Sequence, residues 1–328
     1  MNNYLFFRTD RIGDFLVSAI LIKSIKRNDK NSHITVVASN KNYFYINTLD
    51  FIDEVFLYPE NFIKKIFFFF KLKLKKYKLI CALDGKKRSI YYSILLKSKI
   101  KILMTTKKFF KVVLGSFFSK IYLFDQSKNK IEEIKDLLKL CEMTFDNKDI
   151  HYLENHNIAS KNIRLINNYM TFHFDEKWIY NQYINKYQSI QPNNNEFDKF
   201  IEQLISKTNY NIIITTGLKK NDIIAKFILN LKKINENLYE KKINDKTIQV
   251  YVNIDFFNLK YLIKNTKYLI TCHGASTHLA SACNIKIYDI FDSSQIKFYQ
   301  KWNNHIKNYE FFYRENFNQL TQKILNKL

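Results

Sequence analysis

The chain has 328 residues, of which 46% are hydrophobic and 16% aromatic, so it has ample material for packed cores and wholesale disorder is excluded. This length fits two domains of ordinary size better than one. The formal net charge is +23, which directs attention to anionic partners. No run of about 18 apolar residues occurs, so the sequence predicts no membrane span.

The start of the chain and the spacing of its cysteines indicate the compartment in which the protein works. The first residues, MNNYLFFRTDRIGD, reach an acid before any basic region or small-residue cleavage site, which argues against a secretory signal. The four cysteines lie far apart and form no CxxC pair, which argues against a disulfide framework and a zinc site. We therefore expect a cytoplasmic protein without a metal site.

The first half of the chain alternates short strands with longer helical stretches. A helix is predicted over Asp14–Lys26, where apolar residues recur at helical spacing. The predicted strands are Tyr4–Arg8, His33–Ala38, Val55–Leu57, Leu79–Leu83 and Ile100–Met104. Strands that alternate with helices predict βαβ units and a parallel sheet.

Residues 125–165 change in character, since a helix within SKNKIEEIKDLLKLCEMTF is followed by a polar stretch. The same alternation then resumes. The predicted strands are Tyr169–Phe174, Asn211–Thr215, Gln249–Val252, Tyr268–Thr271 and Lys286–Phe291. The predicted helices are Glu196–Lys207, Asp222–Lys233, Asn258–Asn265, Ser276–Cys283 and Tyr309–Leu328. We expect domains over 1–160 and 161–308, and a final helix over 309–328 that packs across both.

Glycine is rare, with five in the whole chain. Three of them, Gly13, Gly217 and Gly274, follow a predicted strand and precede a helix, where tight turns or close backbone approaches are needed. A helix that begins after such a turn presents free N–H groups to an anion. The segments RIGD, TTGLKKND and CHGASTH are therefore candidate phosphate or carbohydrate loops. Neither a GxGxxG fingerprint nor a P-loop is present.

A strongly basic stretch lies between residues 61 and 120, with 17 Lys and Arg and a single acid, Asp84. Two interpretations stay open: a lysine-rich proteome, or a surface that meets phosphates or an anionic leaflet. Within it, Asn61–Lys78 carries five phenylalanines and seven lysines. Such a segment is typical of an interfacial helix or of an ordinary amphipathic helix on a sheet. We expect the Phe side chains to pack on a sheet and some lysines to face an interface.

Three motifs in a fixed order resemble glycosyltransferase family 9, the heptosyltransferases of lipopolysaccharide core assembly, over nearly the whole chain. The family opens with a strand followed by R-x-D-x-I-G-D, which Arg8, Asp10, Ile12, Gly13 and Asp14 match. Asp175-Glu176-Lys177-Trp178 resembles the family's D-x-K-x-W stretch. His273–Ala280 occupies the place of its D-[ST]-G-x-x-H-[LM]-A motif.

This resemblance implies the GT-B fold, α/β with two Rossmann-like doubly wound domains that face a central cleft. The acceptor would bind the N-terminal domain and a nucleotide-diphosphate sugar, such as ADP-heptose, the C-terminal one. The implied reaction is metal-independent, needs no further cofactor and inverts the anomeric centre. Asp14 is then the base, and Arg8, Asp10, Arg11 and Gly13 form the acceptor-side loop. The implied donor site consists of Lys177, Thr215, Thr216, Gly217, His273, Gly274, Ala275, Ser276, Thr277 and His278.

The residues by themselves leave simpler roles open. Asp14 at a helix start can be an N-cap, and Asp10 with Arg11 a surface ion pair of little energetic value. Lys177 is one of many lysines, and His278 can be a histidine at a helix start with satisfied hydrogen bonds. His273 stands where the family has an aspartate, so the donor sugar stays open as well.

Three classes of function compete at this stage. The first is a glycosyltransferase that acts on a lipid-linked or lipopolysaccharide glycan, cytoplasmic or peripheral on the inner leaflet of the inner membrane. The second is a nucleotide-sugar epimerase or hydrolase with the same architecture. The third is a nucleic-acid-binding protein, which charge alone suggests, without any recognisable binding module. We favour the first and expect no nucleic-acid partner.

Overall fold

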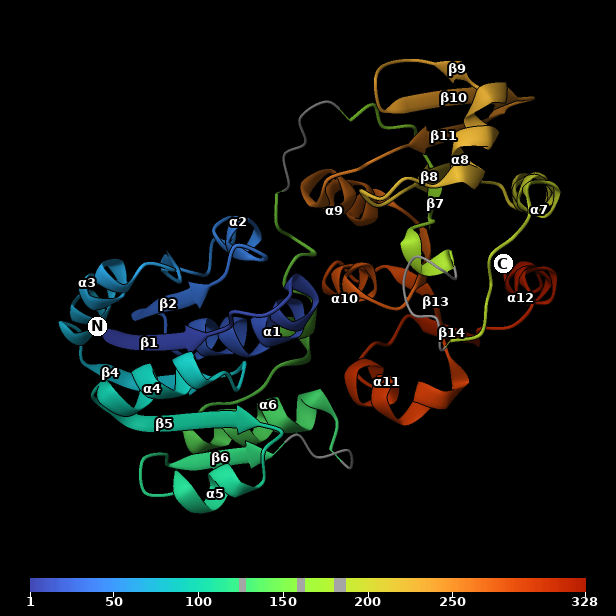
Figure 1. Cartoon of the computed structure of the whole chain (residues 1–328). Coiled ribbons are helices and arrows are strands. Elements are labelled where there is room, and N and C mark those ends of the chain that lie inside the picture. Colours follow the sequence, from blue (N-terminus) through green and yellow to red (C-terminus); the bar gives the residue numbers. More distant parts are fainter. Residues whose placement is uncertain (124–127, 158–162, 180–186) are drawn as a thin grey trace. The chain divides into compact units, whose positions relative to one another are not determined.

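The computed structural model describes residues 1–123, 128–157, 163–179 and 187–328. The chain divides into two compact units, Met1–Tyr152 and Leu153–Leu328 (Figure 1). The boundary expected between residues 160 and 161 lies outside the described residues. Among the residues that are described, no helix is both long and apolar enough to cross a membrane.

The first unit is built on a six-stranded parallel sheet in the order β3-β2-β1-β4-β5-β6. Its strands are β1 (Asn2–Phe7), β2 (Ser32–Ala38), β3 (Glu54–Leu57), β4 (Tyr77–Ala82), β5 (Ser98–Thr105) and β6 (Lys120–Leu123). Its helices are α1 (Ile12–Asn28), α2 (Tyr43–Ile46), α3 (Phe62–Lys73), α4 (Lys87–Leu95), α5 (Phe109–Val113) and α6 (Lys130–Leu140), followed by a 3₁₀ turn over Asn147–His151. The central strand β1 is fully buried from Tyr4 to Phe7, as expected of a parallel strand covered on both faces.

The direction of each crossover decides which face a helix covers. From β1 the chain first moves outward to β2 and β3, and then returns past β1 to β4 and continues to β6. Crossovers between parallel strands are right-handed, so helices that follow opposite directions lie on opposite faces. Consequently α3, α4 and α5 share one face of the sheet, and α1 covers the other.

The second unit is built on an eight-stranded sheet in the order β14-β13-β12-β7-β8-β11-β10-β9, in which β10 runs antiparallel to both of its neighbours and the other pairings are parallel. Its strands are β7 (Tyr169–His173), β8 (Asn211–Thr215), β9 (Lys232–Lys233), β10 (Leu238–Ile243), β11 (Lys246–Tyr251), β12 (Tyr268–Cys272), β13 (Lys286–Phe291) and β14 (Tyr309–Tyr313). Its helices are α7 (Asn194–Lys207), α8 (Asp222–Phe227), α9 (Phe256–Asn265), α10 (Ala275–Ala282), α11 (Ile296–Asn303) and α12 (Phe317–Leu325), with 3₁₀ turns at Glu176–Trp178, Ile228–Asn230 and Ser293–Gln295.

The expected fold class is confirmed, since both units are α/β with doubly wound, mainly parallel sheets. Two expected helices are wrong in part. The helix predicted over Asp222–Lys233 ends at Phe227, because the chain turns into β9, which pairs with β10. The helix predicted over Tyr309–Leu328 begins only at Phe317, because the aromatic run YEFFY forms β14 on the edge of the sheet.

The last helix, α12, packs against α7 in its own unit. Phe317 contacts Trp178 and Phe200 through ring edges, at centroid distances of 6.3 and 5.8 Å. The expected packing of 309–328 across both domains stays a prediction. The expectation for Asn61–Lys78 is wrong for most of its phenylalanines: Phe68 is buried in α3, whereas Phe62, Phe67 and Phe70 are exposed.

Candidate functional site

Each sheet contains a position where the strand order reverses, and in open α/β sheets ligands bind at the carboxyl ends of the strands there. In the first unit this position lies between β1 and β4, and in the second between β7 and β12. The motif residues follow these strands: Arg8–Asp14 comes after β1, Asp175–Lys177 after β7, and His273–His278 after β12. The topology therefore places the sequence motifs at both expected binding positions.

The turn after β7 is held rigidly by a buried tryptophan. Trp178 is fully buried, and its indole N–H donates a 3.0 Å hydrogen bond to the carbonyl oxygen of His173. Asp175 caps the turn by accepting from the backbone N–H of Lys177 at 3.2 Å. The Lys177 ammonium returns to the same carboxylate, with 2.8 Å between Nζ and Oδ2. The fixed backbone thus presents Lys177 at the carboxyl edge of the sheet.

Two of the rare glycines pack against this turn. A Cβ on Gly274 would lie 2.5 Å from the Nζ atom of Lys177, and a Cβ on Gly217 would lie 2.8 Å from the Oε2 atom of Glu176. Neither glycine lies in the left-handed region of φ, and Gly274 is extended at a φ of 169°, so the reason for glycine here is the close approach and not backbone strain. The structure therefore brings together three segments that the sequence singled out separately, those around Lys177, Gly217 and Gly274.

A buried, neutral histidine lies next to the ion pair of Lys177 and Asp175. Burial lowers the pKa of His173 to about 4, against the opposing effect of Asp175. Its Nδ1 atom lies 2.9 Å from the hydroxyl of Thr215, a residue of β8. Burial by itself would raise the pKa of Asp175, but the Lys177 ammonium lowers it. The cluster thus holds one internal ion pair, and an anionic ligand would compete with Asp175 for Lys177.

The turn after β12 leads into α10, whose first turn leaves backbone N–H groups without helical partners. The Thr277 hydroxyl accepts from the N–H of Gly274 at 3.1 Å, which closes the turn. Ser276 pairs with the Thr271 hydroxyl at 2.8 Å, so Ser276 has a structural partner. His278 is buried, its Nδ1 atom has no hydrogen-bond partner, and burial holds its pKa well below the usual range. The interpretation of His278 as a histidine with satisfied hydrogen bonds is therefore wrong for that atom.

A carboxylate that the sequence analysis missed lies next to this turn. Asp289 of β13 is fully buried and accepts from the Thr277 hydroxyl at 2.9 Å and from Tyr309 at 2.8 Å. Its Oδ2 atom is also 2.7 Å from Nδ1 of His273. His273 replaces the aspartate of the resembled family, but the neighbouring strand supplies a carboxylate. The available signal was a single acid in the otherwise apolar strand KIYDIF, since a buried charge needs partners.

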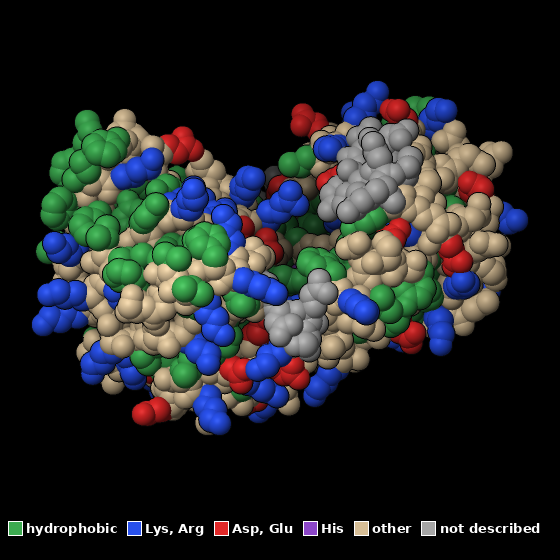
Figure 2. Space-filling view, turned by 60° about the horizontal axis from the view of Figure 1, so that its bottom comes forward, with side chains coloured by type: hydrophobic (Ala, Val, Ile, Leu, Met, Phe, Trp, Pro, Cys, Tyr) green, Lys and Arg blue, Asp and Glu red, His purple; other side chains and the backbone are tan. Residues whose placement is uncertain are grey.

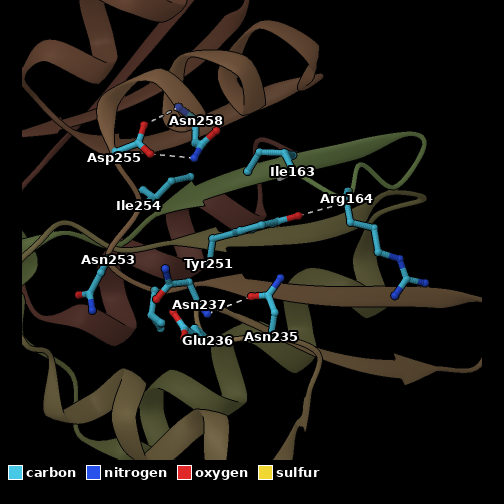
Figure 3. A pocket seen from close by; sticks show the side chains of 11 residues that line it. Ile163, Arg164, Asn235, Glu236, Asn237, Tyr251, Asn253, Ile254, Asp255 and Asn258 are labelled. Carbon is cyan, nitrogen blue, oxygen red and sulfur yellow. Dashed lines mark hydrogen bonds between the residues drawn. The ribbon is translucent and has the colours of Figure 1, made fainter. Parts of the chain in front are cut away.

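Two cavities lie beyond Gly217 at the same edge of the second sheet. The smaller, about 280 Å³, lies between Thr216 and α8. The larger, about 730 Å³, lies at the end of β11 (Figure 3). Both are lined by Val252 and Asn253. The Thr216 hydroxyl accepts from the N–H of Asn253 at 2.9 Å, which joins the two loops. The sequence singles out Thr215, Thr216 and Gly217, whereas residues 253–255, which follow the strand predicted over Gln249–Val252, carry no motif that would mark them.

Figure 3 shows how the walls of the larger cavity are fixed. Asp255 caps α9 by accepting from the backbone N–H groups of Phe257 and Asn258 at 2.8 and 2.9 Å. The hydroxyl of Tyr251 donates to the carbonyl oxygen of Arg164 at 2.8 Å, so the segment that enters the unit lies against β11. Polar side chains and the apolar residues Ile163, Val252 and Ile254 line this cavity together. Such a lining suits a ligand with a flat ring whose edges form hydrogen bonds.

In the first unit, the motif after β1 is organised around a buried arginine. Arg8 is 4% exposed and donates to the carbonyl oxygens of Leu83 and Asp14 at 2.6 and 2.9 Å. Its guanidinium lies 3.1 Å from Asp10 and 3.9 Å from the carboxylate of Asp14. Because Arg8 follows β1 and binds the backbone after β4, it fixes the conformation of the loop that leads from β1 into α1.

The two acids of this loop differ in their surroundings. Asp14 lies in the first turn of α1 and its side chain is 36% exposed, whereas that of Asp10 is 22% exposed. The N-cap of α1 is Arg11, so the simpler interpretation of Asp14 as an N-cap is wrong. Asp10 pairs with Arg8, not as part of a surface pair with Arg11. Burial raises the pKa of Asp10 to about 6, against the opposing effect of Arg8.

A basic cavity of about 580 Å³ adjoins this loop. Its lining includes Thr9, Asp10, Arg11, Ser39, Asn40, Lys41, Tyr58, Glu60, Lys65, Lys86 and Arg88. Lys86 and Arg88 follow β4, and both donate to the backbone oxygen of Thr9, at 2.5 and 3.3 Å. The sequence analysis did not single out these two cations, although DGKKR follows a predicted strand. With five cations and two acids, the cavity suits a hydroxyl-bearing ligand with negative charge.

No family model matches the sequence, and no curated protein matches it either. Solved structures do match, and they define the class of fold as GT-B. An E. coli heptosyltransferase, WaaC, solved with ADP, is similar over 99% of this chain and 100% of its own, with a TM-score of 0.70 at 10% identity. A family 9 glycosyltransferase from Veillonella parvula is similar over 100% and 98%, with a TM-score of 0.66 at 12% identity.

The same fold also occurs in another class of enzyme. A putative UDP-N-acetylglucosamine 2-epimerase from Listeria monocytogenes is similar over 99% of this chain and 88% of its own, with a TM-score of 0.54 at 9% identity. The chain therefore has the GT-B fold, and its resemblance to glycosyltransferase family 9 is confirmed at the level of the fold. The expected cleft between the domains stays a prediction.

Proposed function

We propose that this protein is a glycosyltransferase that moves a sugar from a nucleotide-diphosphate sugar to a lipopolysaccharide-core or other cell-surface glycan. The observation that carries the proposal is the contact between Lys177 and Gly274 at the reversal point of the second sheet. A cation and a helix start converge there, which is what a departing diphosphate needs. The GT-B fold of the heptosyltransferases supports the same function.

The donor would bind the second unit. Its diphosphate would lie against Lys177 and the first turn of α10, and its nucleoside would reach the cavities next to Thr216. Lys177 would exchange part of its pairing with Asp175 for the phosphate oxygens. His273, held by Asp289, lies where the family carries an aspartate, so the sugar need not be heptose.

The acceptor would bind the first unit, where Asp14 is the general base. Its carboxylate would take the proton of the acceptor hydroxyl, and that oxygen would attack the anomeric carbon as the bond to the diphosphate breaks. A single displacement inverts the anomeric centre and needs no metal. The basic cavity next to Thr9 would hold a negatively charged acceptor. We place the enzyme in the cytoplasm, at the inner leaflet on which such glycans are assembled.

The proposal is tested by thermal unfolding with ADP, UDP and GDP sugars. A ligand at about one hundred times its Kd stabilises by about 2.7 kcal/mol, which raises the Tm by several degrees in a chain of this size. A shift with ADP sugars alone favours kinship with heptosyltransferases, and a shift with UDP or GDP sugars assigns another donor. The absence of any shift contradicts the proposal.

An epimerase or hydrolase is the second candidate, because the fold is shared with a putative epimerase. Such an enzyme acts on the nucleotide sugar without an acceptor. Incubation of the protein with the donor identified by unfolding therefore separates the two. Conversion of the donor in the absence of any glycan supports the epimerase or hydrolase, and conversion only with a glycan supports transfer.

A further inference from the structure

Exposed apolar side chains gather on one part of the first unit. More than half of the large hydrophobic side chains that are exposed in the described residues lie between 61 and 120. Figure 2 shows hydrophobic side chains interspersed with Lys and Arg over the first unit, on the left of the view. Contiguous exposed apolar surface on a water-soluble unit indicates an interaction site.

Helix α3 provides the clearest part of this surface. Its exposed apolar residues, with the capping Leu74, are Phe62, Ile63, Ile66, Phe67, Phe70 and Leu74. At about 100° per residue these six side chains fall within an arc of about 140° on the helix. The buried residues Phe68 and Leu72 lie on the opposite side and pack on the sheet. The helix therefore has an apolar outer side, where a surface helix normally carries polar residues.

The neighbouring helices continue this surface. Tyr91 and Leu95 of α4 are exposed, and so are Phe109, Val112 and Val113 of α5. The three helices cover the same face of the sheet and touch one another. Tyr92 of α4 contacts Phe68 of α3 at a centroid distance of 5.3 Å, and Ile90 of α4 shares an apolar cluster with Phe110 of α5. We call the outer side of α3, α4 and α5 the apolar-basic face.

The stretch of chain that forms this face is almost entirely basic. Residues 61–120 contain 17 Lys and Arg and one acid, Asp84. That acid is used at the end of β4, where it accepts from the hydroxyls of Thr9 and Ser89 at 2.6 and 2.9 Å. Lys64 and Lys71 lie beside the apolar arc of α3, Lys73 lies within it, and all three are exposed. Lys71 also lies 3.9 Å from the carboxylate of Glu54 in β3. Lysines beside an apolar surface can bury their stems and keep their ammonium groups at a charged boundary.

We propose that the apolar-basic face docks on a bilayer that contains anionic phospholipid. Helix α3 would lie in the plane of the interface, with Phe67 and its neighbours between the acyl chains and the lysines at the phosphates. The helix does not have to span the bilayer, because the sheet covers its other side. The exposed fraction of Phe67, 71%, leaves most of this side chain available for burial in lipid.

Two other occupants fit the face less well. A second copy of the chain, related by a two-fold axis, would bring the same lysines together and leave their charge uncompensated. A nucleic acid would pair with the lysines but would leave Ile63, Val112 and Val113 without an apolar partner. Only an anionic lipid surface matches both the charge and the aliphatic and aromatic side chains.

This inference rests on the proposed function only for its purpose, since a lipid-linked acceptor would be met at the same surface. Docking is measured without any sugar, so failure of docking and failure of transfer are separate results. If the protein binds vesicles but no nucleotide sugar, membrane docking is supported and the proposed function is contradicted. If it binds a nucleotide sugar but no vesicles, the proposed function is supported and membrane docking is contradicted.

The test is flotation of the full chain with vesicles of phosphatidylcholine, with and without about 30% phosphatidylglycerol. We expect binding to the anionic vesicles, with loss of about tenfold or more of the affinity when salt is raised. The double variant Phe67→Ser/Phe70→Ser is expected to lower binding about tenfold or more without lowering the Tm, because both side chains are exposed. The control is Leu229→Ser, which removes an apolar residue of the second unit that is at least as exposed as either phenylalanine.

Two pairs of charge-reversal variants distinguish binding through the apolar-basic face from binding through the net charge of the whole protein. Lys64→Glu/Lys73→Glu is expected to abolish binding to anionic vesicles, whereas Lys232→Glu/Lys233→Glu, an exposed pair in the second unit, leaves most of it. Equal loss from both pairs would show that total charge alone is responsible. A Phe67→Trp reporter is expected to shift its emission to the blue on anionic vesicles and to be quenched by brominated lipid. No quenching, dimerisation that Phe67→Ser/Phe70→Ser abolishes, or tighter binding to RNA than to vesicles would each overturn the proposal.

Discussion

The side-chain nitrogen of Lys177 lies 2.5 Å from the point that a Cβ on Gly274 would occupy. Lys177 is long and flexible, so Gly274→Ala is expected to displace its ammonium at little cost, below about 1 kcal/mol in the free energy of unfolding. The displaced ammonium no longer meets a diphosphate at the start of α10. We therefore expect the affinity for the probe ADP, or for the nucleotide diphosphate identified by thermal unfolding, to fall about tenfold or more by calorimetry.

Lys177→Ala provides the partner in a double-mutant cycle. If Gly274→Ala acts through Lys177, the double variant binds the nucleotide no more weakly than Lys177→Ala alone. Additive losses would show that the two residues act separately, and an unchanged affinity in Lys177→Ala would remove Lys177 from the site.

The sequence predicted this arrangement only in part. Gly274 and Lys177 were identified because glycine is rare and because the motif order resembles a family, and the contact between them needed the strand order of the second sheet. Asp289 was missed because its partners, Thr277 and His273, lie on other elements. A chain pattern reports neighbours along a strand, whereas parallel strands join residues that are far apart in sequence.

The elements show the same distinction. The buried strands, such as β1 and β8, are continuous apolar runs and were predicted nearly to their ends. Strand β10 was not predicted, and β11 was predicted only from Gln249 onward, because the polar strand β10 has little apolar pattern of its own and depends on pairing with β11. The outward phenylalanines of α3 were predicted to be buried, because an apolar helix side that packs on a sheet and one that is exposed for docking have the same sequence pattern.

An alanine at Gly85 is expected to lower stability much more than an alanine at Gly274. It adopts a φ of +59°, and a Cβ there would lie 2.7 Å from the backbone oxygen of Met104. Because neither the dihedral nor the strand can yield easily, Gly85→Ala is expected to reduce the free energy of unfolding by about 1–3 kcal/mol. Urea unfolding measures this loss. Stability equal to that of Gly274→Ala would contradict the distinction between a backbone clash and a side-chain clash.

Asp289 is the hub of a buried hydrogen-bond network. Asp289→Asn removes the charge and turns one of the two acceptor oxygens, which together serve Thr277, His273 and Tyr309, into an NH2 donor. We expect a loss of about 1–3 kcal/mol of stability and weaker nucleotide binding, since the turn before α10 loses its support. Tyr309→Phe is the control: it removes the hydroxyl that donates to Asp289 and accepts from the Asn303 amide, two hydrogen bonds each worth about 1 kcal/mol, and is expected to leave nucleotide affinity nearly unchanged. Equal effects of both on affinity would show that the turn does not depend on Asp289.

The buried histidine His173 makes stability depend on pH. Burial lowers its pKa in the folded protein to about 4 from the usual 6.5. Between these values the unfolded chain binds more protons, so the contribution of His173 is complete above pH 6.5 and is lost as the pH falls towards 4. At pH 5 this loss is about 2 kcal/mol. We expect His173→Asn to lose less stability than the original chain between pH 7.5 and pH 5, by urea unfolding at both values. Parallel losses in the two proteins would contradict a neutral, buried His173.

Asp14 is the residue on which the proposed chemistry depends. Its carboxylate is 36% exposed, at the start of α1, and lies 3.9 Å from the guanidinium of Arg8, close enough to be oriented and open enough to meet a hydroxyl. Asp14→Asn keeps the shape but cannot accept a proton. We expect the rate of transfer to fall by about 10²–10⁴-fold, while the Tm and the thermal shift with the donor stay near those of the original chain.

Asp10→Asn is the matched control for Asp14→Asn, because Asp10 contacts the same arginine at 3.1 Å but is less exposed. We expect this variant to retain measurable transfer and to change the loop through Arg8 alone. Transfer that survives in Asp14→Asn and disappears in Asp10→Asn would move the role of base to Asp10. Burial raises the pKa of Asp10 to about 6, which is within the range where a base can act.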